Sequence, residues 1–380
     1  MNMKPIYKII IIIVVIMTVG LGIYFIAKSN SKKPEVPVAL GETPAELPVA
    51  PLAPKTPEAV ITTQGLELKK ISEQNVFDFW ITPGTKEIYY LTPVGEIFSA
   101  KEGPDLEMSK QDLGALNSFE PSFDGKKIIA AFGNPLLPQW AVFDLIDKAW
   151  RPLSNDTVAA AWLATSTDEI VVVIKSKNDL NLATLNIAKN PPVYKTLVKD
   201  LRFKDVKIIS RLTSQILISE KPSAFYGSRV WQLDLKTLAF NLLIGPEKGL
   251  NIDFSNDKKL IFKTTSGGLI VLNQALQESE LFSLGILPSK CDSAATSTIY
   301  CFGAQALPTS LNLPDDYFQN KFRSVDVLYS INLDLREVKT VLTSGTGSFP
   351  IIDARRPRYQ DGSLYFINRY DNLLYRLTIK

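Results

Sequence analysis

The 380-residue sequence contains no histidine. This absence excludes Ser-His-Asp and Cys-His catalytic triads, and it excludes zinc or iron sites built on imidazole. The sequence also lacks a Gly-x-Ser-x-Gly motif and a Walker-type phosphate loop, and its two cysteines cannot form a four-thiolate metal site. We therefore expect no catalytic residues, no metal and no cofactor. One enzymatic alternative stays open, because glycoside cleavage needs only paired carboxylates.

An excess of charge of one sign is also lacking. The formal net charge is +3, and residues 1–60 carry six lysines against four glutamates, which leaves about +1 on the rest. A nucleic-acid-binding protein is expected to show a basic stripe, so we expect no nucleic-acid partner. The one tight basic cluster is Arg355-Arg356-Pro357-Arg358. We interpret it as a solvated strand-to-turn segment, with an acidic partner or an anionic surface as the alternative.

Residues 1–28 contain the longest apolar run. From residue 9 to residue 27 there are nineteen residues without a charge, bracketed by Lys4, Lys8 and Lys28. As a helix the run would be about 28 Å long, close to the ~30 Å hydrocarbon core of a bilayer. We predict a single-pass anchor that contacts the lipid bilayer through residues 9–27. A cleaved signal peptide and a soluble helix are the alternatives, although the run is long for a signal and no small-x-small site stands out.

The lysines on the two sides of this segment balance, so the positive-inside rule does not fix its orientation. A single N-terminal span before a large domain most often leaves the N-terminus in the cytoplasm. We therefore expect the remainder of the chain in the cell envelope, outside the cytoplasm. Residues 29–60 contain a proline every three to seven residues, which favours extended polyproline II and predicts a semi-rigid linker. A ligand for a proline-binding module is the alternative for this segment.

Residues 61–380 contain a weak repeat, and its clearest unit is a strand of aromatic and aliphatic residues that often ends in Asp or Asn. The unit recurs at intervals of 39 to 48 residues, with one longer interval before residue 328. Its seven copies are residues 96–99, 140–145, 182–187, 230–235, 269–273, 328–333 and 374–379. Repeats of this length are typical of propellers.

Hairpin turns precede these strands, and a further strand follows them. The turns contain Gly, Asn and Asp, at residues 83–86, 124–126, 165–168, 255–258 and 360–362. Residues 236–243 are an example of the strand that follows. Four strands in each of seven units predict an all-β fold, a seven-bladed β-propeller. The last unit ends after its third strand, so we expect residues 65–71 to pair there as the fourth and close the ring. An open solenoid is the alternative.

Residues 118–129, SFEPSFDGKKII, resemble the hairpin of bacterial TolB-like and WD-repeat-like propellers, and residues 253–260 are a weaker copy. The C-terminal third, with Cys291, Cys301 and Pro314-Asp315-Asp316-Tyr317, is similar to bacterial membrane-anchored propellers. The resemblance implies a propeller over residues 65–380. It does not imply an activity, because propellers serve as enzymes, scaffolds and receptors alike. The Trp-Asp dipeptide of WD repeats does not occur.

Cys291 and Cys301 flank a polar turn and are placed symmetrically about residue 296. A hairpin with its tip there would set the two side chains opposite each other. We predict a disulfide in an oxidising compartment, with two reduced core cysteines as the alternative.

Three long connections between second and third strands are expected on one face: residues 133–139, residues 221–227 and the segment between Phe302 and Ser324. Exposed aromatic residues beside Pro and Asp are typical of contact surfaces. The alternative for the third connection is that Tyr317 and Phe318 fold back and close the channel mouth. Two adjacent aspartates are a weak signal for calcium. The candidate binding residues are Leu136, Trp140, Phe225, Tyr226, Asp315, Asp316, Tyr317, Phe318 and Arg323.

We therefore predict a membrane-anchored, extracytoplasmic propeller that binds an envelope protein or a surface polymer. A carboxylate-based hydrolase or lyase with its site in the central channel is the alternative. A third possibility is a structural subunit of a membrane complex.

Overall fold

The computed structural model describes residues 61–63 and 65–379, apart from residues 102, 165, 178, 203–205, 211, 257–258, 266–267, 274, 283, 296 and 348. The predicted anchor at residues 9–27 and the predicted linker at residues 29–60 lie outside the described residues. Within the described part of the chain, no helix is long and apolar enough to span a membrane.

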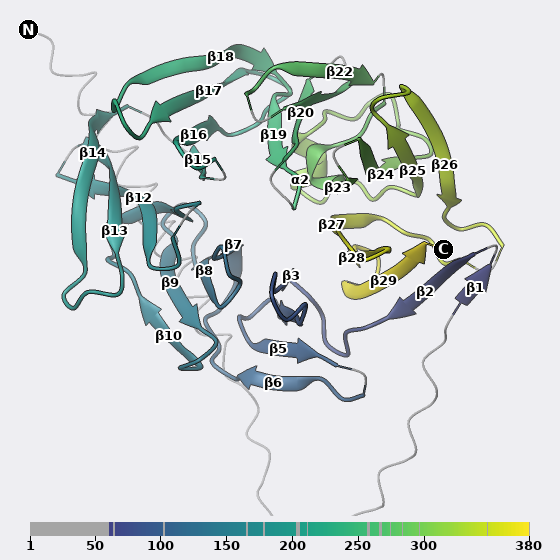
Figure 1. Ribbon diagram of the computed structural model, residues 1–380, viewed down its shortest axis with the longest axis horizontal. Coiled ribbons are helices and arrows are strands. Elements are labelled where there is room, and N and C mark those ends of the chain that lie inside the picture. The colour runs from purple at the N-terminus through teal and green to yellow at the C-terminus, as the bar shows by residue number, and fades with distance from the viewer. Residues whose placement is uncertain are drawn as a thin grey trace, which may run out of the picture. The chain divides into compact units, whose positions relative to one another are not determined.

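Seven antiparallel sheets are arranged around a ring (Figure 1), which confirms the predicted seven-bladed propeller. Blades 1 to 7 are numbered in chain order, and each contains four strands from the centre to the rim, with a fifth strand added in blade 7. The innermost strands are β3 (Asp78–Ile81), β7 (Leu116–Pro121), β11 (Thr157–Trp162), β15 (Val206–Ile209), β19 (Asn251–Phe254), β23 (Cys291–Ala295) and β27 (Ala354–Gln360). The second strands are β4 (Ile88–Leu91), β8 (Lys127–Phe132), β12 (Glu169–Ser176), β16 (Gln215–Glu220), β20 (Ile261–Thr265), β24 (Thr298–Ala304) and β28 (Ser363–Asn368).

The third strand of every blade contains one copy of the sequence repeat. These strands are β5 (Ile97–Ala100), β9 (Gln139–Asp144), β13 (Asp179–Asn186), β17 (Gly227–Asp234), β21 (Gly268–Leu272), β25 (Asp326–Asn332) and β29 (Leu373–Ile379). The outermost strands of blades 1 to 6 are β6 (Leu106–Ser109), β10 (Ala149–Pro152), β14 (Val193–Leu201), β18 (Phe240–Lys248), β22 (Glu278–Phe282) and β26 (Glu337–Thr343). A short 3-10 helix, η1 (Pro288–Lys290), precedes β23, and α2 (Asp315–Phe318) lies between β24 and β25.

Strand β2 (Leu66–Lys70) is the fourth strand of blade 7, where it pairs with β29 and sets Leu68 opposite Leu377. The first and last described strands of the chain therefore share one sheet, and this pairing closes the ring. Strand β1 (Ile61–Thr63) pairs with β2 and adds a fifth strand to this blade. Pairing of the C-terminal strand removes an open sheet edge that would otherwise be free to associate with another chain.

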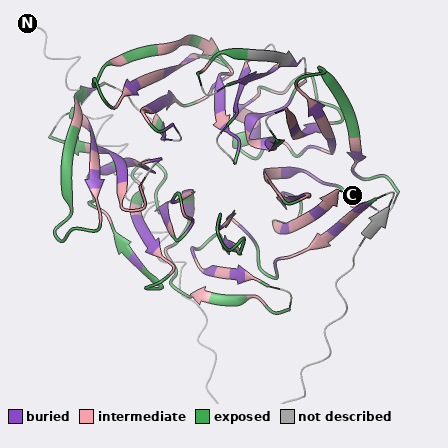
Figure 2. Cartoon of the chain, in the orientation of Figure 1, coloured by how far each residue is buried: buried purple, intermediate pink, exposed green. Residues whose placement is uncertain are grey.

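The hydrophobic cores lie between neighbouring blades. Trp80 and Ile97 of blade 1, for example, pack in one cluster with Phe119 and Phe143 of blade 2. Outer strands such as β14 are largely exposed, as Figure 2 shows by the green along the rim. The alternation of buried and exposed residues along the strands follows from the two-residue period of a pleated sheet.

Two sequence-based interpretations need correction. The outer strand expected at residues 236–243 begins only at Phe240, because residues 235–239 form a turn in which Leu238 has a φ of 58°. The basic cluster at residues 355–358 is not a solvated turn. It belongs to β27, the innermost strand of blade 7, where a bulge between Arg355 and Arg358 gives Arg356 a φ of 52°. The bulge changes the direction of the side chains, as an extra residue in a strand does.

Cys291 and Cys301 face each other across the β23–β24 pair, and their sulfur atoms form a disulfide with an S–S distance of 2.08 Å. Both residues are buried.

Candidate functional site

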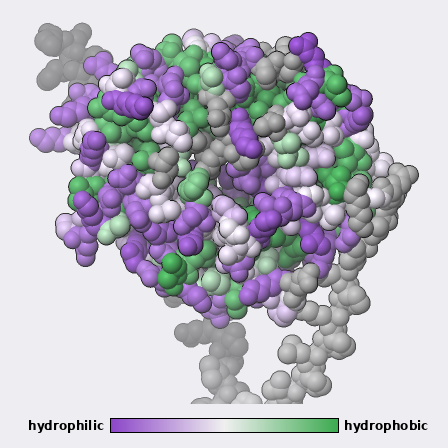
Figure 3. All heavy atoms as spheres, in the orientation of Figure 1, coloured by the Kyte–Doolittle hydropathy of each residue, from purple (hydrophilic) through white to green (hydrophobic). Residues whose placement is uncertain are grey.

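Connections between second and third strands emerge at the same end of every blade, because successive strands in an antiparallel sheet alternate in direction. We call this side of the ring the loop face and the opposite side the turn face. The loop face carries many of the exposed large apolar residues: Val94, Leu136, Leu137, Phe225, Tyr226, Leu307, Phe318, Ile351 and Tyr370. Figure 3 shows that one face of the ring mixes hydrophilic residues with smaller hydrophobic groups.

The longest connection on the loop face is residues 305–325 between β24 and β25, and we call it the blade 6 loop. It accounts for the stretched interval in the repeat. The backbone of residues 314–319 closes the short helix α2 through hydrogen bonds from Phe318 to Pro314 and from Gln319 to Asp315. Phe318 is 47% exposed and the neighbouring Tyr317 only 5%. The two aromatic residues of the predicted binding motif therefore have different surroundings.

The two adjacent aspartates of the blade 6 loop bind different partners. The Asp315 carboxylate accepts a hydrogen bond of 2.6 Å from the backbone N–H of Ala224, in the connection between β16 and β17 of blade 4. The Asp316 carboxylate accepts one from the N–H of Asn312 and forms an ion pair of 3.3 Å with Lys321. The first aspartate joins two loops and the second stabilises its own loop.

Tyr317 does not present its ring to solvent. The Arg369 guanidinium lies 4.1 Å from the ring centroid and the Lys290 ammonium 5.2 Å from it. Tyr317 therefore folds back onto the propeller, as the alternative interpretation of this loop predicts. Phe318, which that interpretation also includes, remains exposed. Burial raises the pKa of Tyr317 above its ordinary value.

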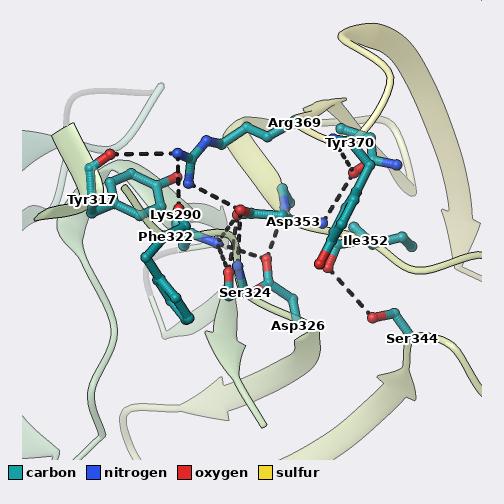
Figure 4. Close-up of polar contacts among 12 residues, drawn as sticks. Lys290, Tyr317, Phe322, Ser324, Asp326, Ser344, Ile352, Asp353, Arg369 and Tyr370 are labelled. Carbon is teal, nitrogen blue, oxygen red and sulfur yellow. Dashed lines mark hydrogen bonds and ion pairs between the residues drawn. The ribbon is translucent and has the colours of Figure 1, made fainter. Parts of the chain in front are cut away.

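A buried ion cluster lies beneath Tyr317, between blades 6 and 7 (Figure 4). The Lys290 ammonium donates to Asp326 and Asp353, both at 2.7 Å, and to the Ser324 hydroxyl at 2.9 Å. Arg369 donates to the second carboxylate oxygen of Asp353 at 2.9 Å. These five residues, which we call the ion cluster, are each no more than 6% exposed.

The ion cluster holds charges that stabilise one another. Burial alone would lower the pKa of Lys290, but Tyr317, Asp326 and Asp353 together raise it above its ordinary value. Lys290 is therefore a protonated cation and cannot act as a base toward Ser324. Arg369 also donates to the Asn320 side chain at 2.9 Å and to the carbonyl of Phe322 at 3.2 Å. The cluster thus anchors the blade 6 loop to blade 7.

The remaining predicted binding residues differ in exposure. Leu136 is 82% exposed, Tyr226 is 74% exposed and Phe225 is also exposed, so all three are accessible on the loop face. Trp140 packs instead against the hydrophobic cluster between blades 2 and 3. Arg323 lies with its guanidinium 5.7 Å from the ring centroid of Tyr370.

Two carboxylates of the innermost strands, Asp78 of β3 and Asp253 of β19, face cations. Asp78 and Arg356 form an ion pair of 2.6 Å, and Lys207 lies 3.8 Å from Asp253. Burial would raise the pKa of Asp253, but Lys207, Arg358 and Arg356 together lower it. A general acid needs a raised pKa and access to its substrate, and the ionised Asp253 lacks the first requirement.

Asp292, on the innermost strand β23, has a carboxyl with a raised pKa. Burial raises the pKa of its carboxyl to about 6, although Arg358 and the N–H groups of Asn256 and Tyr359 act in the opposite direction. Asp292 is fully buried, so a substrate in the channel cannot reach it. In the described part of the chain, no three Cys, Asp or Glu side chains are grouped so that they could hold a metal ion.

A pocket of about 440 Å³ opens on the loop face over blade 5, and we call it the blade 5 pocket. Its walls come from blades 4, 5 and 6. The lining residues are Ala224, Lys248, Gly249, Thr264, Thr265, Gly268, Leu284, Gly285, Ile286, Leu287, Leu307, Leu313 and Pro314.

Sequence reasoning did not identify the ion cluster. Asp326 and Asp353 stand at or just before the starts of strands, and Lys290 precedes a cysteine, but such positions are common in a β-rich chain. No local pattern marks them, because residues from four separate segments meet only when blades 6 and 7 pack together.

No family model matches the chain, and no curated protein matches it. Solved structures match its fold. The β-propeller domain of Myceliophteria thermophila Cps50 (Swd1) is 8% identical, with a TM-score of 0.53, over 82% of this chain and 100% of that one. YCF48 bound to D1 peptide is 10% identical, with a TM-score of 0.55, over 85% of this chain and 100% of that one. An oligogalacturonate lyase in complex with manganese is 11% identical, with a TM-score of 0.50, over 82% of this chain and 98% of that one. The chain is a seven-bladed β-propeller.

Proposed function

We propose that this protein is a non-enzymatic binding module, in which residues 9–27 anchor the propeller to a membrane and the loop face contacts an envelope protein or a surface polymer outside the cytoplasm. The proposal includes kinship with TolB-like, membrane-anchored propellers, on the hairpin at residues 118–129. The apolar run of residues 9–27 supports the anchor, and the Cys291–Cys301 disulfide supports an oxidising compartment.

The observation that carries the binding role is the hydrogen bond between Ala224 and Asp315. It joins two loops that carry exposed aromatic residues, so the contact surface is organised before a partner arrives. A preorganised surface loses less conformational entropy on binding. YCF48, a propeller of similar fold, has a solved structure in which it is bound to D1 peptide. A protein partner is therefore compatible with this architecture.

The enzymatic alternative has less support. The channel carboxylates Asp78 and Asp253 face Arg356 and Lys207 rather than each other. One solved structure of similar fold is a lyase, but at 11% identity the likeness extends to the fold alone. The third possibility is a structural subunit of a membrane complex. Every observation that favours it favours the binding role equally.

In-cell crosslinking with mass spectrometry tests the proposal. The triple variant Phe225→Ser, Tyr226→Ser, Phe318→Ser removes exposed aromatic rings without touching the ion cluster. We expect it to lose a specific crosslinked partner while its unfolding midpoint stays near that of the wild type. The matched control is Ile146→Ser, Leu335→Ser, which removes exposed apolar side chains from the turn face. An identical partner set for wild type, triple variant and control would refute a binding role for the loop face.

Cell fractionation tests the anchor. The full chain should sediment with membranes, and a chain without residues 1–28 should not. Protease added outside intact spheroplasts should degrade the propeller, whereas protection from it would place the propeller in the cytoplasm and contradict the orientation.

A further inference from the structure

The blade 5 pocket has the composition of a site for part of another chain. Its volume of about 440 Å³ lies within the ~300–1,000 Å³ typical of ligand pockets. Leu284, Ile286 and Leu287 form one wall, and Leu307 and Leu313 of the blade 6 loop form another. Such walls favour aliphatic groups, since burial of apolar surface stabilises a complex.

A polar group inside the pocket lacks a partner. The Thr264 side chain is only 6% exposed, and its hydroxyl oxygen has no hydrogen-bond partner among the residues that the structure describes. A buried hydroxyl without a partner destabilises the folded state. The hydroxyl oxygen itself is covered, so a ligand with a hydrogen-bonding group would remove this cost after the Thr264 side chain turns toward it. Such a ligand carries both apolar and polar groups.

The charge at the pocket defines the ligand further. Lys248 is the one charged residue among the described lining residues, its side chain is exposed, and it forms no ion pair within the described part of the chain. The neighbouring lysine on β20, Lys263, is already paired with Glu247 and Glu278. An incoming carboxylate would therefore find Lys248 free.

We propose that the blade 5 pocket binds an extended peptide segment of a partner protein that has aliphatic side chains followed by an acidic residue. An extended peptide supplies the three required groups at once: aliphatic side chains for the leucine walls, backbone amides for the Thr264 hydroxyl, and a carboxylate for Lys248. The exposed rings of Phe225 and Tyr226 follow Ala224 at the rim and extend the contact area. This inference rests on the proposed binding role of the loop face and specifies the chemistry of the partner.

Fluorescence anisotropy with the full chain in lipid nanodiscs tests this proposal. The probe is the labelled peptide Gly-Ser-Leu-Leu-Glu-Glu-Ser-Gly, compared with counterparts in which Ala-Ala replaces Leu-Leu or Lys-Lys replaces Glu-Glu. We expect saturable binding of the first peptide and binding at least about tenfold weaker for both counterparts. Absence of saturable binding, or equal binding of all three peptides, would overturn the proposal.

Three variants, two of them with a matched control, locate the binding. Ala224→Leu fills the pocket and keeps the backbone N–H that bonds Asp315, and it should weaken binding about tenfold. Ala149→Leu, on the exposed outer strand β10, should leave binding unchanged.

Lys248→Glu should weaken binding of the acidic peptide about fivefold, whereas Lys236→Glu on the turn face should not. Thr264→Val should weaken binding about fivefold and leave thermal stability equal or higher, because it removes an unpartnered hydroxyl.

Equal effects of Ala224→Leu and Ala149→Leu would overturn the assignment to this pocket. The crosslinking experiment and the peptide-binding experiment test the two proposals independently. Loss of the cellular partner in the aromatic triple variant, combined with no peptide binding, would retain the binding role and remove the pocket. Peptide binding with an unchanged partner set would retain the pocket and remove the aromatic surface as the cellular contact.

Discussion

The backbone N–H of Ala224 donates a hydrogen bond of 2.6 Å to the carboxylate of Asp315, although 91 residues separate the two in the sequence. Ala224 follows the second strand of blade 4, and Asp315 begins α2 in the blade 6 loop. The bond therefore spans blade 5 and closes one side of the blade 5 pocket. Hydrogen bonds to a charged acceptor are stronger than neutral ones, so this single contact can fix the relative position of two loops.

Replacement of Asp315 by alanine should release the two loops from each other. We expect the free energy of unfolding to fall by about 1–3 kcal/mol, as for loss of a hydrogen bond to a charged group. Hydrogen exchange should increase at residues 221–226 and 305–323. Asp334→Ala, at an exposed turn between β25 and β26, is the control and should change neither quantity. Unchanged exchange in the Asp315 variant would contradict a role for this bond in joining the loops.

Replacement of Lys290 by methionine should strongly destabilise the fold. The substitution leaves Asp326 and Asp353 buried with less compensating charge, and loss of one partner of a buried ion pair costs about 3–5 kcal/mol. Lys321→Met is the matched control, because the Lys321 side chain is 60% exposed and an ion pair of an exposed lysine is worth at most about 1 kcal/mol. Urea denaturation measures both values. Similar losses of unfolding free energy in the two variants would show that burial does not determine how much the ion cluster contributes to stability.

The Cys291–Cys301 disulfide should be present in protein isolated from cells. Iodoacetamide added under denaturing conditions should modify neither thiol before reduction and both after it, as measured by mass spectrometry. The double variant Cys291→Ala, Cys301→Ala should lose about 3 kcal/mol, because the bond closes a loop with a sequence separation of 10. Two alkylated thiols in unreduced protein would contradict both the bond and the oxidising compartment.

Asp292 should make stability depend on pH in a defined direction. Burial raises the pKa of its carboxyl to about 6 in the folded state, whereas an unfolded Asp titrates near ~3.9. Between these values the folded state holds a proton that the unfolded state has released. The contribution of Asp292 to stability is therefore complete below about pH 4 and is lost as the pH rises through about 6.

The measurement is the difference in unfolding free energy between the wild type and Asp292→Asn from pH 3.5 to 7.5. We expect this difference to fall between about pH 4 and pH 6 and then to remain constant. Arg358 lowers the pKa of Asp292, so Arg358→Met should move the end of the fall to higher pH. A difference that is independent of pH, or that rises with it, would contradict the raised pKa.

The sequence determined the blade number and the third strand of each blade. Aromatic and aliphatic residues at a two-residue period form half-buried strands, and the Gly, Asn and Asp residues between them permit tight turns. Both signals are local, so seven copies can be counted without a structure. The facing positions of Cys291 and Cys301 are local in the same way, because a hairpin's register follows from its turn.

The tertiary structure alone decided which side chains of the predicted motif are accessible. Tyr317 and Phe318 are adjacent in sequence, yet one packs on Arg369 and the other faces solvent. The basic residues at 355–358 were predicted to form part of a turn, but they lie on an innermost strand. Burial and ion pairing depend on residues contributed by other blades. The contacts among Lys290, Asp353 and Arg369, and the walls of the blade 5 pocket, exist only once those blades pack side by side.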